Sequence, residues 1–398
     1  MRTTILVGVC LLLAVSAVRA DSLNCRLVGT YGVPVGYPTD VAVADSLAYV
    51  AAAHGGLRIV SLTEPQNPTE VGFFDAMANA IGVAVRDSIA YVAGHAAGVF
   101  LVNVADPRNP TLAGQRGTPA VAPRVAVKDT FLYVTNRDAG LRVLSVANPV
   151  SPYEVGFCDT LAFYEDVAVK DTIACVSGAL QSLFLTINVA NPASPTLAGY
   201  CALPSSGQGL SVSGSYAYVT AGDMLIIDVI DPTDPQEVGR YASPSYSADV
   251  LVVGDFAYVA GGYAGLRVVD VSNPQQPQEV GYYDTPGYSN GVALAGDYVC
   301  VTEDPVGLRV FQFYGAGVEE RRSTPDASRI TPGASIVRGV LRLAIDGCRM
   351  SNAELLDISG RSVMPLESGA NDVSRLAPGV YFVHSPVSAA IRKIVVGD

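Results

Sequence analysis

Short apolar runs separated by turn residues recur along the chain in a fixed order. Each copy has an apolar run such as "VAV", a two-residue turn, a second run such as "AYV", a loop, and a third run such as "LRVVDV". Asn-Pro-x-x-Pro and Glu-Val-Gly follow, as in "LRVVDVSNPQQPQEVG" at residues 266–281. β-branched and aromatic runs of this length, bounded by Gly, Pro, Asn and Asp, are typical of strands, and helical periodicity is absent. The pattern predicts four short strands per copy.

The chain holds seven copies of this unit. Equivalent positions at the start of the first strand are 40 to 43 residues apart: Val41, Val83, Val125, Val167, Leu210, Val250 and Val292. The turn after each first strand begins with Asp or Gly, which tolerate the positive φ of tight hairpins. These turns are Asp45-Ser46, Asp87-Ser88, Asp129-Thr130, Asp171-Thr172, Gly214-Ser215, Gly254-Asp255 and Gly296-Asp297. Four strands in about 42 residues form one blade of a β-propeller, so we expect a seven-bladed β-propeller at residues 21–314.

The two ends of the repeat region complement each other. The seventh copy ends at residues 308–313 without a proline turn or a fourth strand, whereas a strand-like segment at residues 26–31 precedes the first copy. We predict that residues 26–31 pair with residues 308–313, complete the last blade and close the ring.

The third strands and their turns carry a family resemblance. "LRVVDVSNPQQPQEVG", "LIIDVIDPTDPQEVG" and "VFLVNVADPRNPTLAG" resemble the LVIVD repeats of bacterial and archaeal cell-surface proteins, in which an apolar strand ends in Asp before an Asn/Asp-Pro turn. The resemblance covers residues 26–314. It implies a propeller in an extracytoplasmic setting and brings no established chemistry. The chain has no Trp, so the eukaryotic WD propeller is not the match.

The N-terminus and the charge distribution indicate export and restrict the partners. Residues 1–20 combine Arg2, an apolar run and small residues before Asp21, which are the features of a cleaved signal peptide. No later segment has the 18 or so apolar residues of a membrane-spanning helix, so we expect an extracellular or cell-surface protein. Residues 21–314 hold 13 basic and 28 acidic residues. This acidity argues against nucleic acid as a partner and is compatible with neutral sugars or cations.

The C-terminal part differs in composition. Residues 315–332 are rich in charge, Pro, Gly and Ser and are predicted to be a linker. Residues 333–398 alternate apolar runs with turns, which predicts a small, immunoglobulin-like β-sandwich. "SNAELLDISGRSV", "NDVSRLAPGVYFVHS" and "IRKIVV" resemble the sorting domain of type IX secretion substrates. The resemblance implies that outer-membrane secretion machinery is a partner; an immunoglobulin-like appendage without an export role is the alternative.

The loops that join one blade to the next, and those between second and third strands, vary most and lie on one predicted face. Because the ring closes, blades six, seven and one are neighbours. Their loops bring together the ligand-binding candidates: Tyr37, Tyr246, Tyr288, Tyr263, Asp40, Asp249, Asn290 and His54. Aromatic rings beside carboxylate and amide groups suit sugars. Packing of these tyrosines over the hairpins is the alternative, and a hydrogen bond that fixes the first strand is the alternative for the aspartates.

Catalytic and cofactor motifs are not evident. The chain has only three His residues, no Gly-x-Ser-x-Gly motif and no calcium-binding loop. We therefore predict no metal site, no cofactor and no catalytic residues. Cys175 and Cys300 replace a repeated Tyr and are interpreted as small buried residues, with disulfides as the alternative. Four repeat-position arginines are interpreted as solvated charges: Arg58, Arg142, Arg267 and Arg309.

We therefore expect a non-enzymatic propeller that binds a glycan or a protein through its loop-rich face. One alternative is an enzyme acting on polysaccharide with a carboxylate pair such as Asp40 and Asp249. A passive surface scaffold is the other alternative.

Overall fold

A computed structural model describes residues 22–77, 79–160 and 163–315, together with seven strands between residues 335 and 396. The chain divides into two compact units, Met1–Glu320 and Arg321–Asp398. The predicted signal peptide and residues 316–332 of the predicted linker lie outside the described residues.

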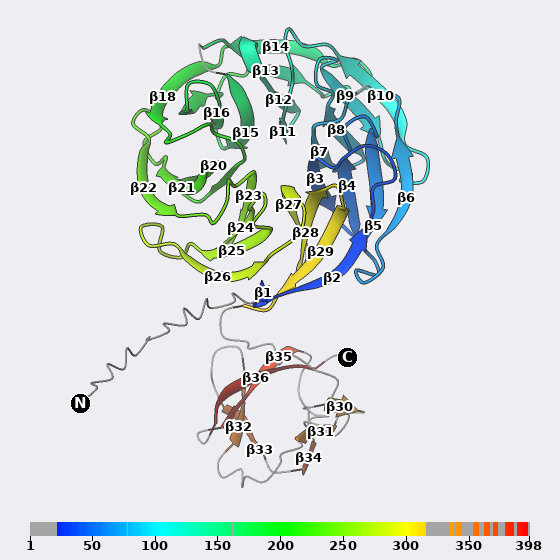
Figure 1. Ribbon diagram of the computed structural model, residues 1–398, viewed down its shortest axis with the longest axis vertical. Helices are drawn as coiled ribbons and strands as arrows, with labels where there is room; N and C mark the ends of the chain where they lie inside the picture. Colours follow the sequence, from blue (N-terminus) through cyan, green and yellow to red (C-terminus); the bar gives the residue numbers. More distant parts are fainter. Residues whose placement is uncertain are drawn as a thin grey trace, which may run out of the picture. The chain divides into compact units, whose positions relative to one another are not determined.

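The first unit is a ring of seven antiparallel sheets, each running from an inner to an outer strand (Figure 1). Blade one contains β3 (Asp40–Ala44), β4 (Leu47–Ala51), β5 (Leu57–Ser61) and β6 (Thr69–Phe74). Blade two contains β7 (Gly82–Arg86), β8 (Ile89–Ala93), β9 (Val99–Asn103) and β10 (Thr111–Arg116). Blade three contains β11 (Val125–Lys128), β12 (Phe131–Asn136), the 3-10 turn η1 (Arg137–Ala139), β13 (Gly140–Ser145) and β14 (Tyr153–Cys158). Blade four contains β15 (Tyr164–Lys170), β16 (Ile173–Gly178), β17 (Leu183–Asn188) and β18 (Thr196–Ala202).

The remaining blades follow the same order. Blade five contains β19 (Leu210–Ser213), β20 (Tyr216–Ala221), β21 (Asp223–Asp228) and β22 (Gln236–Tyr241). Blade six contains β23 (Asp249–Val253), β24 (Phe256–Ala260), β25 (Leu266–Asp270) and β26 (Gln278–Tyr283). Blade seven contains β27 (Tyr288–Ala295), β28 (Tyr298–Asp304), β29 (Gly307–Phe313) and β2 (Cys25–Tyr31). The prediction of an all-β, seven-bladed propeller is confirmed.

The N-terminal segment closes the ring as predicted. Strand β2 pairs antiparallel with β29, from Cys25 opposite Phe313 to Tyr31 opposite Leu308. The blue β2 therefore lies beside the yellow β29 in Figure 1. A further short strand, β1 (Ser22–Leu23), pairs with the outer strand β26 of blade six, which the sequence did not predict. The N-terminal segment thus joins the last two blades.

The inner hairpins have the turn geometry that their sequences require. The first turn residue has a positive φ in all seven blades, between 50° and 59°: Asp45, Asp87, Asp129, Asp171, Gly214, Gly254 and Gly296. Asp and Gly are among the residues that enter this region at low cost. The repeated Asp-Ser and Gly-Asp dipeptides are thus explained by backbone conformation.

The Glu-Val-Gly and Asn-Pro-x-x-Pro segments fit each other across blades. A Cβ on Gly72 of β6 would clash with the carbonyl group of Pro107 in the turn of the next blade. The same clash with a turn proline of the next blade would occur at Gly29, Gly114, Gly156, Gly199 and Gly239. Blade seven has no such turn, and Gly281 of blade six faces Phe313 and Cys25 instead. These two segments repeat because each outer strand must admit its neighbour's turn.

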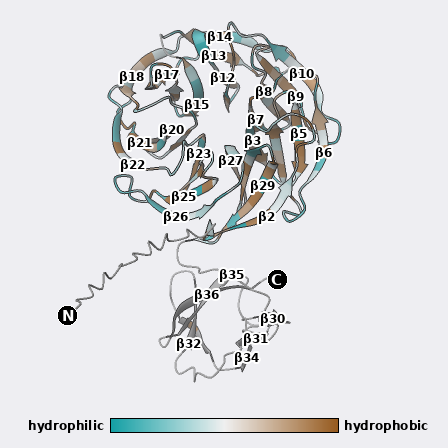
Figure 2. Cartoon of the chain, in the orientation of Figure 1, coloured by the Kyte–Doolittle hydropathy of each residue, from teal (hydrophilic) through white to brown (hydrophobic). Residues whose placement is uncertain are grey.

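The apolar core lies between adjacent blades. One cluster combines Tyr49 and Ile59 of blade one with Val92 and Phe100 of blade two, and six similar clusters follow around the ring. In Figure 2 the strands carry most of the hydrophobic colour, as on β5 and β9. Cys175 and Cys300 are buried and free, which confirms their interpretation as small core residues.

The interpretation of the repeated arginines as solvated is wrong. Arg58, Arg142 and Arg267 are at most 7% exposed. An aromatic ring of the outer strand covers each guanidinium at 4.7 to 4.8 Å, and an acidic side chain approaches it; Arg142 lies 4.7 Å from the Phe157 ring and 2.8 Å from Asp159. Arg309 pairs with buried Glu303 at 2.5 Å. Burial is tolerated because each charge is paired, and in Arg58, Arg142 and Arg267 an aromatic ring also covers the flat face.

The second unit contains two antiparallel sheets within its described residues. One sheet has the order β30 (Ser335–Val337), β31 (Val340–Leu343) and β34 (Gly369–Asp372). The other has the order β33 (Ser362–Leu366), β32 (Ala353–Asp357), β35 (Gly379–Ser385) and β36 (Ser388–Val396). The packing of these sheets as a sandwich stays a prediction.

Candidate functional site at the propeller axis

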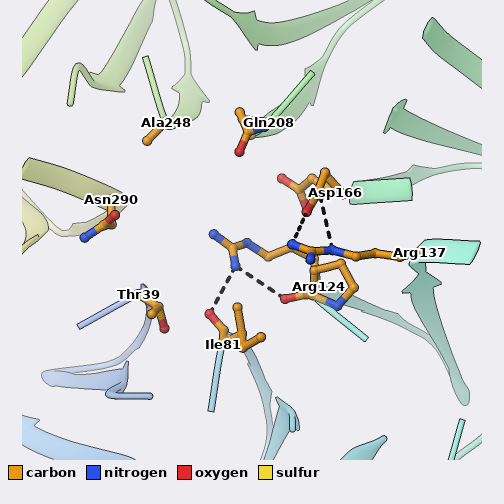
Figure 3. A pocket seen from close by; sticks show the side chains of 11 residues that line it. Thr39, Ile81, Arg124, Arg137, Asp166, Gln208, Ala248 and Asn290 are labelled. Carbon is orange, nitrogen blue, oxygen red and sulfur yellow. Dashed lines mark hydrogen bonds and ion pairs between the residues drawn. The ribbon is translucent and has the colours of Figure 1, made fainter. Parts of the chain in front are cut away.

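The loops that enter the inner strands converge on a cavity of about 200 Å³ at the propeller axis (Figure 3). Every blade contributes the residue two positions before the start of its repeat: Thr39, Ile81, Pro123, Glu165, Gln208, Ala248 and Asn290. Arg124, Arg137, Asp166 and Gly209 complete the wall. The cavity lies on the loop-rich face, where the sequence placed the variable segments.

Three aspartates beside this cavity join neighbouring blades. Asp40 accepts hydrogen bonds from the backbone N–H of Val41 in its own blade, at 2.8 Å, and of Val83 in the next, at 2.9 Å. Asp166 accepts in the same way from Val167 and Leu210, and Asp249 from Val250 and Val292. The interpretation that these aspartates fix the first strand is confirmed, and each also fixes the first strand of the following blade.

Burial sets the protonation of these carboxyl groups. It raises the pKa of Asp166 to about 8 and the pKa of Asp249 to about 7, in competition with the nearby Arg124 charge and the accepted backbone hydrogen bonds. Burial also raises the pKa of Asp40, against the same arginine. Desolvation disfavours the charged form of a carboxyl group, so Asp166 and Asp249 lose their protons at a higher pH than an ordinary aspartate.

Two arginines bring positive charge to the cavity. Arg124 donates from Nη1 to the carbonyl oxygen of Ile81 at 3.0 Å, and its Nε lies 3.8 Å from Oδ2 of Asp40. Arg137, which begins the 3-10 turn, lies 3.2 Å from Glu165 and 5.1 Å from the Phe163 ring. Figure 3 shows the Arg124 side chain reaching across the cavity toward Asn290 and Thr39.

The structure brings the predicted aromatic residues together in two pairs. Tyr263 and Tyr288 contact edge to face with ring centroids 4.9 Å apart, and Tyr37 and His54 do so at 6.0 Å. Tyr246 donates from its hydroxyl to the carbonyl oxygen of Ser206 at 2.8 Å. Burial, with smaller effects of Tyr246 and Tyr263, raises the pKa of Tyr288. Tyr263 is 74% exposed, Tyr37 44% and Tyr246 38%, so these rings remain accessible.

The other predicted residues have different positions. Asn290 lines the cavity and donates to the carbonyl oxygen of Pro38 at 3.0 Å. Asp40 and Asp249 each accept two backbone hydrogen bonds and are not among the residues that line the cavity. Glu303, near the end of β28, is fully buried against Arg309.

The sequence reasoning missed Arg124, Arg137, Glu165 and Gln208. Arg124 occupies the same repeat position as Asp40. The opposite charge at this one repeat position was a signal of a site at the axis. Arg137 of blade three and Glu165 of blade four come from consecutive blades, and their pairing depends on how these two blades pack against each other.

Many groups of the cavity wall can make hydrogen bonds. Among the described residues, no group of three or more His, Cys, Asp or Glu is arranged to hold a metal ion. No helix in the described part of the chain is long and apolar enough to cross a membrane. Guanidinium, amide and hydroxyl groups around a small cavity, beside exposed aromatic rings, can bind a hydroxyl-bearing ligand.

These features define a closed seven-bladed β-propeller with a polar axial cavity. The family model described as the LVIVD repeat matches residues 35–76, 78–118, 121–160, 205–243, 244–285 and 286–310. These segments make up more than half of the chain, which belongs to the LVIVD repeat family. Blade four falls between the matched segments, but it has the same four strands.

Solved structures share the fold at low sequence identity. The WD40 β-propeller domain of Doa1 has a TM-score of 0.57 at 13% identity, over 73% of this chain and 97% of that chain. The computationally designed Ika8 protein has a TM-score of 0.55 at 11% identity, over 69% of this chain and 83% of that chain. No curated protein matches the sequence.

Proposed function

We propose that the protein is a non-catalytic binding propeller whose loop-rich face binds a carbohydrate. The observation that carries the proposal is the aromatic arc, the exposed Tyr246, Tyr263 and Tyr37 on loops of blades six and one, two of which lie two residues before residues of the polar cavity. Sugar rings present C–H faces that stack on aromatic rings and hydroxyls that bond to amide and guanidinium groups.

A protein ligand is the alternative outcome of the same test. A stable protein interface covers about 800 Å² on each partner and has aromatic anchors at its centre. The accessible aromatic residues of the candidate site instead lie on loops that lead to the residues of a small cavity, which favours a ligand of sugar size. Catalysis is not part of the proposal, because Asp40 and Asp249, the carboxylates considered for it, each hold two backbone N–H groups.

A glycan array with the full chain tests the proposal. Tyr263→Ala should weaken binding about fivefold to tenfold, because it removes a stacking ring worth about 1 kcal/mol. Tyr200→Ala is the matched control, since Tyr200 is 64% exposed on the outer strand β18, away from the axis. If the Tyr263 variant binds glycans as tightly as the unchanged protein does, the tyrosines are not part of the binding site. Binding to proteins but to no glycan would favour the alternative.

We further propose that the protein is exported and that its C-terminal unit addresses it to outer-membrane secretion machinery. The signal features of residues 1–20 and the sorting-domain motifs of residues 351–398 support this proposal. Intact-mass measurement of the protein exported by its native host should show loss of residues 1–20 and report whether the tail is removed. Retention of Met1 in a cell-associated protein would contradict export.

A further inference from the structure

The axial cavity has hydrogen-bonding groups that the propeller does not use. Nη1 of Arg124 donates to the carbonyl oxygens of Ile81 and Pro123, at 3.0 and 3.3 Å, whereas Nη2 donates to no described group. Gln208 donates through Nε2 to Ser206 and Gly207, which leaves its Oε1 as an open acceptor. Asn290 likewise uses only its Nδ2. One donor and two acceptors are therefore available to a ligand.

The open donor faces the part of the cavity that adjoins the tyrosines. Figure 3 shows the Arg124 guanidinium directed toward Asn290 and Thr39, which belong to blades seven and one. Asn290 lies two residues after Tyr288, and Thr39 lies two residues after Tyr37. A ligand bonded to Arg124 therefore extends over the same loops that carry the aromatic arc.

The charges around the cavity favour a neutral ligand. Four carboxyl groups surround the two guanidinium groups: Asp40, Asp166, Asp249 and Glu165. Glu165 pairs with Arg137 and Asp40 faces Arg124, so a ligand anion would meet arginines already opposed by carboxylates. A cation would meet the Arg124 guanidinium at the open end. Hydroxyl groups, which donate and accept without charge, fit both kinds of partner.

The size of the cavity suits a single ring. A cavity of about 150 Å³ holds a six-membered ring such as benzene. The axial cavity, at about 200 Å³, is slightly larger and is lined by polar groups.

We infer that the axial cavity binds one uncharged sugar residue of the ligand, with Arg124 Nη2 donating to a hydroxyl and Asn290 and Gln208 accepting from hydroxyls. This inference rests on the proposed carbohydrate binding and adds the site and the chemical class. The cavity therefore selects hexoses over hexuronates, whose carboxylate would lie among the acidic groups of the axis.

The test uses an array of matched oligosaccharides whose terminal residue is either a hexose or the corresponding hexuronate, probed with the full chain. The hexose members should bind at least about tenfold more tightly than their hexuronate partners. Arg124→Lys keeps the charge that opposes Asp40 but loses the Nη2 donor, so it should weaken hexose binding about tenfold. Ala248→Leu fills the cavity without removing a hydrogen bond and should have a similar effect.

Two control variants separate the site from general effects. Arg240→Lys changes an arginine of the outer strand β22, and Ala202→Leu enlarges an exposed alanine of β18. Both should bind as the unchanged protein does, and thermal unfolding should show that all four variants are folded.

The outcomes distinguish the inference from the proposed function. If no carbohydrate binds the unchanged protein, both are wrong. If carbohydrate binding responds to Tyr263→Ala but not to Arg124→Lys or Ala248→Leu, only the axial site is wrong. Equal binding of hexose and hexuronate would overturn the selectivity for an uncharged ring.

Discussion

The hydrogen bonds of Asp166 predict the effect of Asp166→Asn. The carboxyl oxygens accept from Val167 at 2.7 Å and from Leu210 at 2.8 Å, so one side chain fixes the inner strands of blades four and five. Asparagine has a single acceptor oxygen, and its amide group would face the second backbone N–H. The substitution therefore leaves one buried N–H without a partner at nearly unchanged side-chain volume.

The expected loss can be worked from these contacts. A buried donor left unsatisfied costs about 1–3 kcal/mol. The gain from removing a buried charge is small at pH 5, because Asp166 has its pKa raised to about 8 and is protonated in the folded chain. We expect a loss of about 2 kcal/mol in the free energy of unfolding at pH 5, or about 4 °C in Tm for a domain of this size.

The loss should shrink as the pH rises. An ordinary Asp ionises near 3.8, and burial raises the pKa of Asp166 to about 8 in the folded protein. Between these values the folded chain binds more protons than the unfolded chain, so the free energy of unfolding falls with increasing pH. The Asn variant lacks this titration. The difference between the two proteins should narrow by at least about 1 kcal/mol from pH 5 to pH 9.

Urea unfolding at pH 5, 7 and 9 measures these differences. Asp171→Asn is the control, because Asp171 is exposed in the hairpin turn of the same blade and Asn also tolerates its positive φ of 50°. The control should change stability by no more than about 0.5 kcal/mol. The reasoning is refuted if Asp166→Asn is as stable as the unchanged protein at pH 5, or if the difference widens toward pH 9.

Two other predictions concern closure and the buried thiols. Deletion of residues 22–31 removes β1 and β2 and exposes Phe311, which is fully buried in the closed ring. The deletion should therefore cause aggregation or proteolysis. A deletion variant that stays monomeric and resistant to protease would contradict closure. Burial raises the pKa of Cys175 and of Cys300 to about 12, so both should resist thiol reagents at pH 8 until the protein is unfolded. Cys201 is partly exposed, with its pKa raised to about 11, and should react before them; rapid labelling of Cys300 in the folded protein would show that blades seven and one separate.

Most of the fold could be predicted because it depends on local patterns. Turn residues such as Asp129 need a particular φ, and outer-strand glycines such as Gly72 must admit a neighbouring turn, so both recur in the repeat. The burial of Arg267 could not be read in this way. Its environment depends on Tyr282 across the sheet and on Asp284 in the next loop, and a positive charge in a strand is usually solvated.

The candidate site was only partly predictable. The adjacency of blades seven and one followed from closure, whereas the Tyr263–Tyr288 pair joins the consecutive blades six and seven. The contacts of Arg124, in blade three, with Asp40 of blade one and Ile81 of blade two could not be inferred from the sequence. They form only because the arginine side chain is long enough to reach both residues. The position of a residue in the repeat indicates on which face of the propeller it lies, but not which residues of other blades its side chain contacts.

Crowding at the axis explains why this position varies between blades. The residue before the start of the repeat is, in order, Asp40, Gly82, Arg124, Asp166, Gly209, Asp249 and Gly291. A Cβ on Gly209 would clash with Asp249, and one on Gly291 would crowd Asp40, so at these two places glycine makes room for the aspartate of the following blade. Seven positions cannot alternate perfectly around a closed ring, so one adjacent pair must be of the same kind, and in this chain it is a pair of side chains. It occurs at Arg124 and Asp166, where opposite charges make closeness favourable. The uneven distribution of side chains around the cavity thus follows from the odd number of blades.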